Sequence, residues 1–209
     1  MSILTTIYIV RHGESVWNVQ KILQGQSNSS LTRKGEQQAQ NLAAKLRTVH
    51  FDAIFSSDST RAHKTAEIIA AERKLAVRTT ELLRERFFSI YEGRNYHEDE
   101  ELKKVFQLYN EASAEEKRTM KHGGIESDDE IISRFIIILR EIAVLYPGRT
   151  ILAVSHSGIM RQFLNYLGYL THEEMRWTAI VNTAYIKVET DGVDFFIKEV
   201  YGVTKKGTV

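Results

Sequence analysis

The sequence contains no cysteine and only one proline in 209 residues. The lack of cysteine excludes disulfide bonds, thiolate metal sites and cysteine nucleophiles, and it is compatible with a reducing compartment. The formal net charge is +1, so the chain has no overall field that would favour nucleic acid or an anionic membrane. A site for an anion must therefore be built from a local cluster of basic residues.

Long apolar runs are also missing, since none approaches the roughly 20 residues that span a bilayer. The N-terminal residues, Met1 to Thr6, carry no basic segment before their apolar part. We therefore expect no signal peptide and a cytoplasmic location. Hydrophobic residues make up 43% and charged residues 26% of the chain, as in an ordinary globular protein. Because no repeat, low-complexity segment or linker is evident, we expect a single domain over residues 1–209.

Strand-like apolar runs alternate with helical patterns along the first part of the chain. Strands are expected at 4–10, 52–57 and 75–77, with a polar loop at 15–30 and helices that begin near Thr32 and Ser59. This β-α-β-α-β order predicts an α/β fold. Its central sheet is mostly parallel, and helices on both faces make a three-layer sandwich.

The second half begins with a segment, 86–125, in which aromatic and charged residues are mixed. We interpret it as a lid over one end of the sheet, with a helix around 98–111 and aromatic residues that serve mainly as core. A capping box at Ser127–Glu130 then starts a helix that runs to about Leu145. A strand at 150–154, a helix to Leu167, and an edge hairpin of 184–188 and 195–201 are expected to follow.

Charged residues stand where the expected strands end. The first strand is followed by Arg11 and His12, and the strand at 150–154 is followed by His156. The carboxyl ends of parallel strands meet at one edge, where open α/β sheets bind ligands. A third strand leads to Arg61 in the first turn of a helix, where both the helix N-terminus and the guanidinium favour an anion. Together these residues describe a phosphate pocket.

Five groups of residues in this order carry a resemblance to a known family. They are Arg11-His12-Gly13-Glu14 with Ser15 and Trp17-Asn18; Leu31-Thr32 with Gly35 and Gln38-Ala39; Ser56-Ser57 with Arg61-Ala62 and Thr65-Ala66; Leu83-Arg84-Glu85-Arg86 with Glu92-Gly93; and Ser155-His156 with Gly158 and Arg161. The pattern, which extends from residue 7 to about 165, resembles the histidine phosphatase superfamily. That group includes the cofactor-dependent phosphoglycerate mutases, so the resemblance implies a phosphoglycerate mutase-like fold.

The resemblance also implies roles for five residues. His12 would be the nucleophile that attacks phosphorus and forms a phosphohistidine. Glu85 would protonate the leaving alcohol oxygen and then take a proton from the hydrolytic water. Arg11, Arg61 and His156 would hold the non-bridging oxygens. No metal is implied, because these cationic side chains supply the charge that a metal would otherwise provide.

Four further residues are expected to contact the phosphate or the substrate: Asn18, Gln24, Gly25 and Ser157. The chain departs from the family pattern at Ser157, where many members have a second glycine after the histidine. It departs again at Ser89, which replaces a glycine common after the acid/base group. Each of the main residues also has a purely structural explanation. His12 could simply hydrogen-bond to the main chain, Arg61 could be a surface arginine on a helix, and Glu85 could belong to a solvated charged face.

Three functions are compatible with these residues. A mutase of this family grips a second phosphate with a pair of adjacent arginines in a longer insertion, whereas residues 94–124 contain only Arg94 and Arg118. We therefore expect a metal-independent phosphomonoesterase that acts on a small phosphorylated metabolite without a cofactor. A phosphoglycerate mutase that uses 2,3-bisphosphoglycerate and a non-catalytic phosphate-binding module are the alternatives. We expect no nucleic-acid or membrane partner, and a monomer or homodimer.

Overall fold

The computed structural model describes residues 3–205. The strands within this range are β1 (Thr5–Arg11), β2 (Ala53–Ser57), β3 (Val77–Thr80), β4 (Thr150–Ser155), β5 (Ala179–Thr190) and β6 (Phe195–Thr204). The α-helices are α1 (Val16–Gln20), α2 (Arg33–Lys45), α3 (Thr60–Ala70), α4 (Glu100–Glu111), α5 (Ala114–Thr119), α6 (Asp128–Leu145), α7 (Ser157–Tyr166) and α8 (His172–Trp177). Short 3-10 helices cover Glu81–Leu83, Ser89–Tyr91 and His122–Gly124.

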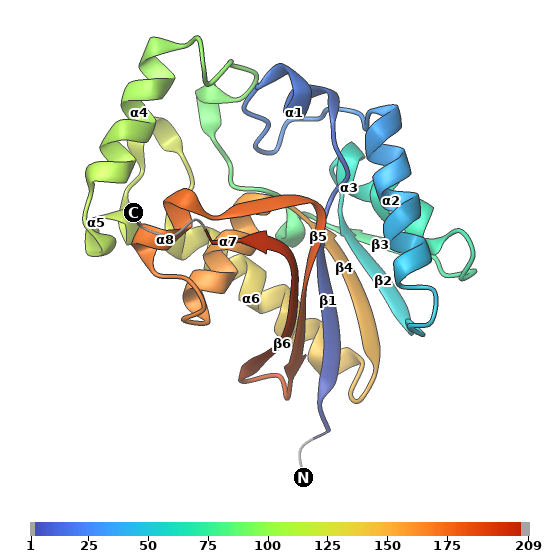
Figure 1. Ribbon diagram of the computed structural model, residues 1–209. Coiled ribbons are helices and arrows are strands. Elements are labelled where there is room, and N and C mark those ends of the chain that lie inside the picture. The colour runs from blue at the N-terminus through green and yellow to red at the C-terminus, as the bar shows by residue number, and fades with distance from the viewer. Residues whose placement is uncertain (1–2, 206–209) are drawn as a thin grey trace.

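The strands form one sheet in the order β3-β2-β4-β1-β5-β6. Strands β3, β2, β4 and β1 pair in parallel, β5 is antiparallel to β1, and β6 is antiparallel to β5. Figure 1 shows β5 and β6 as the C-terminal hairpin on one side of the sheet. The predicted mostly parallel sheet with a hairpin at its edge is confirmed.

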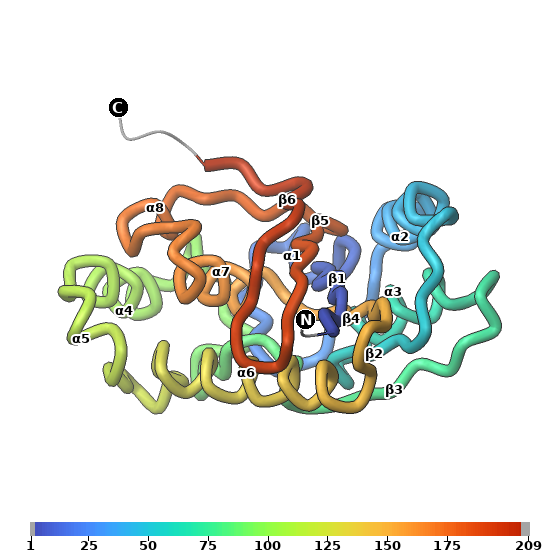
Figure 2. The backbone as a smooth tube through the Cα atoms, turned by 90° about the horizontal axis from the view of Figure 1, so that it is seen from below, coloured from blue at the N-terminus to red at the C-terminus, as the bar shows by residue number. Residues whose placement is uncertain are grey.

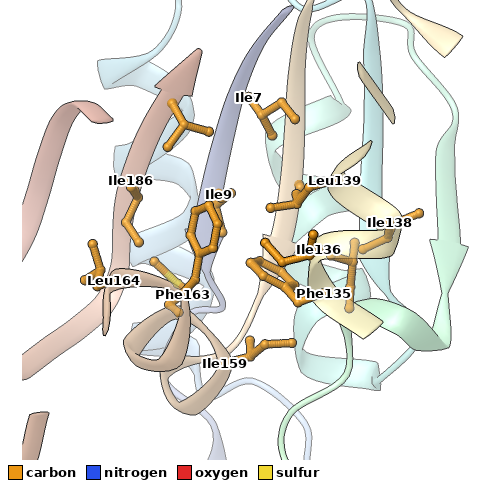
Figure 3. Close-up of a cluster of buried hydrophobic side chains, with 14 of the residues drawn as sticks. Ile7, Ile9, Phe135, Ile136, Ile138, Leu139, Ile159, Phe163, Leu164 and Ile186 are labelled. Carbon is orange, nitrogen blue, oxygen red and sulfur yellow. The ribbon is translucent and has the colours of Figure 1, made fainter. Parts of the chain in front are cut away.

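Alternate residues of β1 face the two helical layers. Ile7 and Ile9 pack in one core with Phe135 of α6 and Phe163 of α7, as Figure 3 shows. Tyr8 and Val10 point the other way, into a core with helices α2 and α3. Figure 2 shows α6 and α2 on opposite sides of the strands. A central strand buried on both faces reads as a continuous apolar run, and the predicted three-layer sandwich is confirmed.

Side-chain caps determine where several helices begin. The predicted capping box at Ser127 and Glu130 starts α6, and the Thr32 hydroxyl accepts from the Gly35 amide at the start of α2. The same kind of box starts α5 at Ser113 and α8 at Thr171, two helices that were not predicted. Each box satisfies main-chain donors that a helix N-terminus leaves unpaired.

Three predicted boundaries were wrong. The third strand was expected at 75–77 but is Val77–Thr80, because Leu75 packs against the core while the strand itself is polar and lies at the sheet edge. The expected loop at 15–30 contains α1, which starts with a capping box at Ser15. Strand β5 begins at Ala179, earlier than the expected 184, because an irregularity between Ile180 and Tyr185 breaks the alternating pattern.

The segment interpreted as a lid, residues 86–125, contributes no strand to the sheet. It carries α4 and α5, and both views place these helices beside α7 and α8. Tyr91, Leu102 and Val105 form a small buried cluster of their own within it. Throughout residues 3–205, no helix is both long enough and apolar enough to cross a membrane.

Candidate active site

Two histidines lie side by side at the carboxyl ends of β1 and β4. These strands are neighbours, with Arg11 opposite Ser155, so His12 and His156 follow at the same level of the sheet. The centroids of the two imidazole rings are 5.2 Å apart, and both side chains are buried. The main-chain amide of His12 donates to the carbonyl of Ser155 at 3.1 Å, which holds the two strand ends together.

The hydrogen bond of His12 defines which ring nitrogen is free. Its Nδ1 lies 2.7 Å from the carbonyl oxygen of Gly13. A carbonyl can only accept, so Nδ1 carries the proton and Nε2 keeps its lone pair. Burial, followed by the charges of Arg61 and Arg11, holds the pKa of His12 well below its usual value. The imidazole is therefore neutral at neutral pH, the state that a nucleophile requires.

His156 is neutral for similar reasons. Burial is the largest cause that lowers its pKa well below the usual value, and the charge of Arg61 acts in the same direction. Its Nε2 lies 3.4 Å from the hydroxyl oxygen of Ser59. Its Nδ1 is buried and has no hydrogen-bond partner in residues 3–205.

Arg61 is held by main-chain carbonyls. Its Nη1 donates to the Ser27 carbonyl at 2.8 Å and its Nη2 to the Gly25 carbonyl at 2.7 Å. The loop that carries these carbonyls is fixed by Glu92, whose carboxylate accepts from the amides of Gln26 and Ser27 at 2.9 Å each. Gly25 has a φ of +50°, and a Cβ there would lie 2.0 Å from the Glu92 carboxylate. Glycine is therefore required at this position.

Arg11 and Arg61 place buried donors in the same site. Burial lowers the pKa of each guanidinium to about 10, so both remain charged at neutral pH. The Nη1 of Arg11 donates to the carbonyl of Ile180, but the Nε of each arginine, like Nδ1 of His156, has no partner within the described chain. A buried unpaired donor costs roughly 1–3 kcal/mol. An oxyanion, which accepts several hydrogen bonds at once, would satisfy the two Nε–H groups, and also Nδ1 of His156 in the tautomer that carries its proton there.

The carboxylate of Glu85 lies at the N-terminus of α7, the helix that begins directly after His156. Its carboxylate accepts from the amides of Gly158 at 2.8 Å, Ile159 at 3.0 Å and Arg86 at 2.9 Å. A Cβ at Gly158 would lie 2.4 Å from the carboxylate oxygen, so a side chain at that position would displace Glu85. The helix N-terminus and three main-chain donors thus hold this carboxylate at the first turn of α7, the helix that His156 caps.

The other expected contacts fall into two groups. The Oδ1 of Asn18 accepts from the Ser15 amide at 3.1 Å. Its Nδ2 group lies on the other side of the amide and remains a donor. Gln24 accepts from the Ser15 hydroxyl at 2.8 Å and is buried, and the Gly25 carbonyl holds Arg61. Gln24 and Gly25 therefore build the wall of the site. Ser157 is the first residue of α7, and within residues 3–205 its hydroxyl makes no hydrogen bond.

Asn182 was not among the predicted site residues. Its Nδ2 donates to the carbonyl of His12 at 3.1 Å and lies 3.4 Å from the Oδ1 of Asn18. The irregular stretch of β5 directs it there, and the next residue, Thr183, has a φ of +60°. A β-branched residue in this region is strained. This contact depends on a long-range strand pairing, so no local sequence signal could have found it.

Arg161 and Ser89 were noted in the sequence without a role. Arg161 donates to the carbonyl of Thr178 at 3.2 Å, and its Nε is buried with no partner in the described residues. Burial lowers its pKa, while the charge of Glu85 opposes that effect. Ser89 has a φ of +55°, the left-handed conformation that explains why glycine is common at the matching position of the family.

A cavity of about 620 Å³ adjoins the site on the side of α4 and α8. It is lined by Gly158 and Arg161 of α7 and by Arg86, which follows Glu85 in the chain. His12, Arg11 and Arg61 do not line it. Glu85 and His156 do not line it either, so the cavity approaches the site through Gly158 and Arg86, whose amides donate to Glu85.

Comparison with known proteins identifies the family. A family model described as the histidine phosphatase superfamily, branch 1, matches residues 7–201. The chain belongs to this superfamily. The finding confirms the resemblance seen in the sequence, and the phosphatases and phosphoglycerate mutases of this group share the fold described above.

Similar proteins carry both kinds of name. A broad-specificity phosphatase of Saccharomyces cerevisiae is 30% identical over 205 residues, covering 93% of this chain and 84% of the yeast protein. Phosphoglycerate mutase-like protein 4 of Arabidopsis thaliana is 36% identical over 157 residues, covering 74% and 67% of the two chains. The solved structure of Bacillus stearothermophilus YhfR is 28% identical with a TM-score of 0.78, covering 92% and 95%.

Proposed function

We propose that this member of the superfamily is a phosphomonoesterase that hydrolyses a small phosphorylated metabolite through a phosphohistidine on Nε2 of His12. The observation that carries the proposal is the hydrogen bond from Nδ1 of His12 to the Gly13 carbonyl, 2.7 Å long. It leaves the lone pair on Nε2, inside a site with two arginine cations and unpaired buried donors.

The first chemical step forms the phosphohistidine. The Nε2 lone pair of His12 attacks phosphorus, and the bond from phosphorus to the ester oxygen breaks. Glu85 gives a proton to that oxygen, so the alcohol leaves in its neutral form. Arg11, Arg61 and His156 stabilise the charge on the three non-bridging oxygens, where most of it is spread in the transition state.

The second step releases phosphate. A water molecule takes the place of the alcohol and attacks phosphorus, the bond to Nε2 breaks, and Glu85 accepts a proton from the water. The products are inorganic phosphate and the starting form of the enzyme. The same carboxylate thus serves as acid and then as base, and it is held for both steps by the first turn of the helix that follows His156.

The lid favours hydrolysis over mutase activity. Its residues 94–124 hold no adjacent pair of arginines that could grip a second phosphate. Arg86, which lines the cavity, already forms a 2.5 Å ion pair with the buried carboxylate of Asp128. The adjacent pair of arginines with which a mutase of the family grips a second phosphate is therefore missing from this segment.

Hydrolysis of 4-nitrophenyl phosphate in the presence of EDTA tests the proposal. We expect turnover by the wild-type protein and a loss of roughly 10⁴-fold or more in His12→Ala, because removal of a nucleophile eliminates the covalent route. His50→Ala, which changes a histidine with 88% of its side chain exposed, is the matched control and should retain full activity. Acid-labile, base-stable phosphate should be trapped on the wild type and not on His12→Ala.

Three results would overturn the proposal. Full activity in His12→Ala would exclude the covalent mechanism. Isomerisation of 3-phosphoglycerate in the presence of 2,3-bisphosphoglycerate, faster than phosphate release, would establish the mutase alternative. Phosphate binding without turnover of any ester would indicate the non-catalytic module.

A further inference from the structure

We infer that Arg134 of α6, paired with Glu126, positions the segment of main chain that carries Glu85 and so determines how efficiently the leaving alcohol is protonated. The inference rests on the proposed function and adds a positioning residue to that same site. Arg134 contacts neither the substrate nor the phosphate in this assignment, because it acts through the main chain of Glu85.

Side chains satisfy four consecutive main-chain carbonyls, those of residues 82–85. Arg134 donates to three of them, at 2.9, 2.7 and 3.0 Å, which belong to Leu82, Arg84 and Glu85. The hydroxyl of Ser155 donates to the remaining one, that of Leu83, at 2.8 Å, and Gln26 adds a longer bond of 3.3 Å to the carbonyl of Glu85. Carbonyls that are not paired within a sheet or helix need such partners. The path of the main chain at Glu85 therefore depends mainly on one guanidinium.

The guanidinium of Arg134 has no donor left for a substrate. Its Nε and Nη2 also donate to the carboxylate of Glu126, at 2.7 and 3.0 Å, so that all five of its N–H groups are used. Arg11 and Arg61, in contrast, each keep a buried Nε without a partner in the described residues. An arginine with a free donor can bind phosphate, whereas Arg134 can only hold the groups that it already contacts.

Glu126 fixes the other side of the same segment. Its carboxylate accepts from the amide of Phe87 at 3.1 Å, and its own amide donates to the carbonyl of Phe87 at 2.9 Å. The side chains of Arg134 and Glu126 are only 16% and 12% exposed, so their bidentate pair is largely shielded from water. Because Phe87 lies two residues after Glu85, the pair holds the main chain both before and after the acid group.

The proton transfer is the step that depends on this arrangement. The carboxylate of Glu85 must lie within hydrogen-bond reach of the leaving oxygen, and a shift of its main chain would change that distance. Propanol leaves poorly without a proton, whereas 4-nitrophenolate leaves readily as an anion. A disturbance of Arg134 should therefore slow the hydrolysis of propyl phosphate more than that of 4-nitrophenyl phosphate.

Arg134→Lys removes the planar fork and keeps the positive charge. That charge adds to the larger effects of burial and of Arg61 in lowering the pKa of His156, so it should be retained in the test. Lysine presents its donors from a single atom and cannot reach three carbonyls and a carboxylate together.

The measurement is the ratio of kcat/KM for propyl phosphate to that for 4-nitrophenyl phosphate. Both values come from one preparation, so their ratio does not depend on the fraction of enzyme that is folded. The ratio should fall at least about tenfold in Arg134→Lys. It should fall by a smaller factor in Glu126→Gln, because the glutamine amide still accepts one of the bonds from Arg134.

The double variant Arg134→Lys/Glu85→Gln distinguishes positioning from general damage. If Arg134 acts through Glu85, the double variant should show the same ratio as Glu85→Gln alone. Arg73→Lys is the matched control and should keep the wild-type ratio. Arg73 also donates to two main-chain carbonyls, those of Ile69 and Leu46, neither of which belongs to the segment of Glu85.

Two results would contradict the role of Arg134 and leave the proposed function intact. One is an unchanged ratio in Arg134→Lys, or in Glu126→Gln if only that variant folds. The other is a further fall of the ratio when Arg134→Lys is added to Glu85→Gln. Failure of His12-dependent hydrolysis for every ester in the wild-type protein would instead overturn the proposed function itself.

Discussion

The proposed phosphate site and the cavity that Gly158 and Arg86 line are neighbours but are held together by different contacts. In the site, main-chain groups hold the charged side chains. The carbonyls of Gly25 and Ser27 accept from Arg61, and three amides donate to Glu85. The path of the backbone therefore defines where these charges lie.

Around the cavity, side chains hold side chains. The hydroxyl of Tyr109, on α4 of the lid, donates to the carboxylate of Asp128 at 2.7 Å, and the same carboxylate pairs with Arg86. The wall itself consists of side chains from the lid, α7 and α8. The difference suggests a division of labour. Substitutions in the site should change the rate for every substrate, and substitutions around the cavity should change the stability of the lid.

Arg61→Gln should give the largest effect that tests this division. Loss of one buried cation from the transition state should lower kcat by about 10³-fold, and by the same factor for aryl and alkyl phosphates. Steady-state kinetics on both substrates measures it. Arg73→Gln is the matched control, because Arg73 also donates to two main-chain carbonyls, those of Ile69 and Leu46. A loss confined to one substrate would contradict the division.

Glu85→Gln should depend on the leaving group. Propyl phosphate needs a proton on its leaving oxygen, so its kcat/KM should fall by about 10²-fold more than that of 4-nitrophenyl phosphate. The parameter kcat/KM reports the steps up to phosphohistidine formation. Glu92→Gln, which changes a carboxylate that holds the loop of Arg61, should affect both substrates by the same factor. An equal loss in Glu85→Gln would exclude its role as the acid.

Tyr109→Phe tests the cavity side of the comparison. The substitution removes a hydrogen bond to the buried, charged carboxylate of Asp128, so the free energy of unfolding should decrease by about 2 kcal/mol. Urea unfolding measures this change. Tyr166→Phe, at a tyrosine that is 51% exposed, should leave stability unaltered. If Tyr109→Phe behaves like this control, the Tyr109–Asp128 bond does not hold the lid.

The buried histidines of the site predict a pH dependence of stability. Because burial lowers the pKa of His12 and His156 in the folded protein, the unfolded chain binds more protons below about pH 6.5. The free energy of unfolding is thus highest above pH 6.5. It should fall on acidification by up to about 1.4 kcal/mol per pH unit for each histidine.

Urea unfolding of wild type, His156→Gln and His50→Gln between pH 7.5 and 5.5 measures this contribution. His156→Gln should show the shallower dependence, and His50→Gln should follow the wild type, because His50 is exposed. A wild-type stability that does not change over this interval would mean that the site accommodates charged histidines.

Local signals account for the features that were predicted correctly. The apolar run before Arg11 and His12, and the capping box at Ser127, depend only on neighbouring residues. The same capping signal is present at Ser113 and Thr171 and would have revealed α5 and α8. Sequence reasoning therefore reached the central strands and the placement of the main charged residues.

The features that were missed depend on distant parts of the chain. Asn182 reaches the carbonyl of His12 through the irregular pairing of β5. Gly25 was expected as a ligand contact, but its bond to Arg61 depends on Glu92, which fixes the loop. The polar edge strand β3 is stabilised by its pairing with β2 more than by the hydrophobicity of its own residues. Such contacts across the fold leave no periodic pattern in the sequence.

The attachment of Glu85 to α7 has a consequence for any movement of the lid. Two of its three amide donors belong to the first turn of α7, whose N-cap is His156. In the proposed mechanism Glu85 is the proton donor and His156 a phosphate ligand, and these bonds tie both to α7 and to the end of β4. A displacement of α4 and α5 large enough to admit a substrate, or to release a product, would leave the distance between these two side chains unchanged. In the proposed mechanism, the lid could therefore open or close without changing the relative positions of Glu85 and His156.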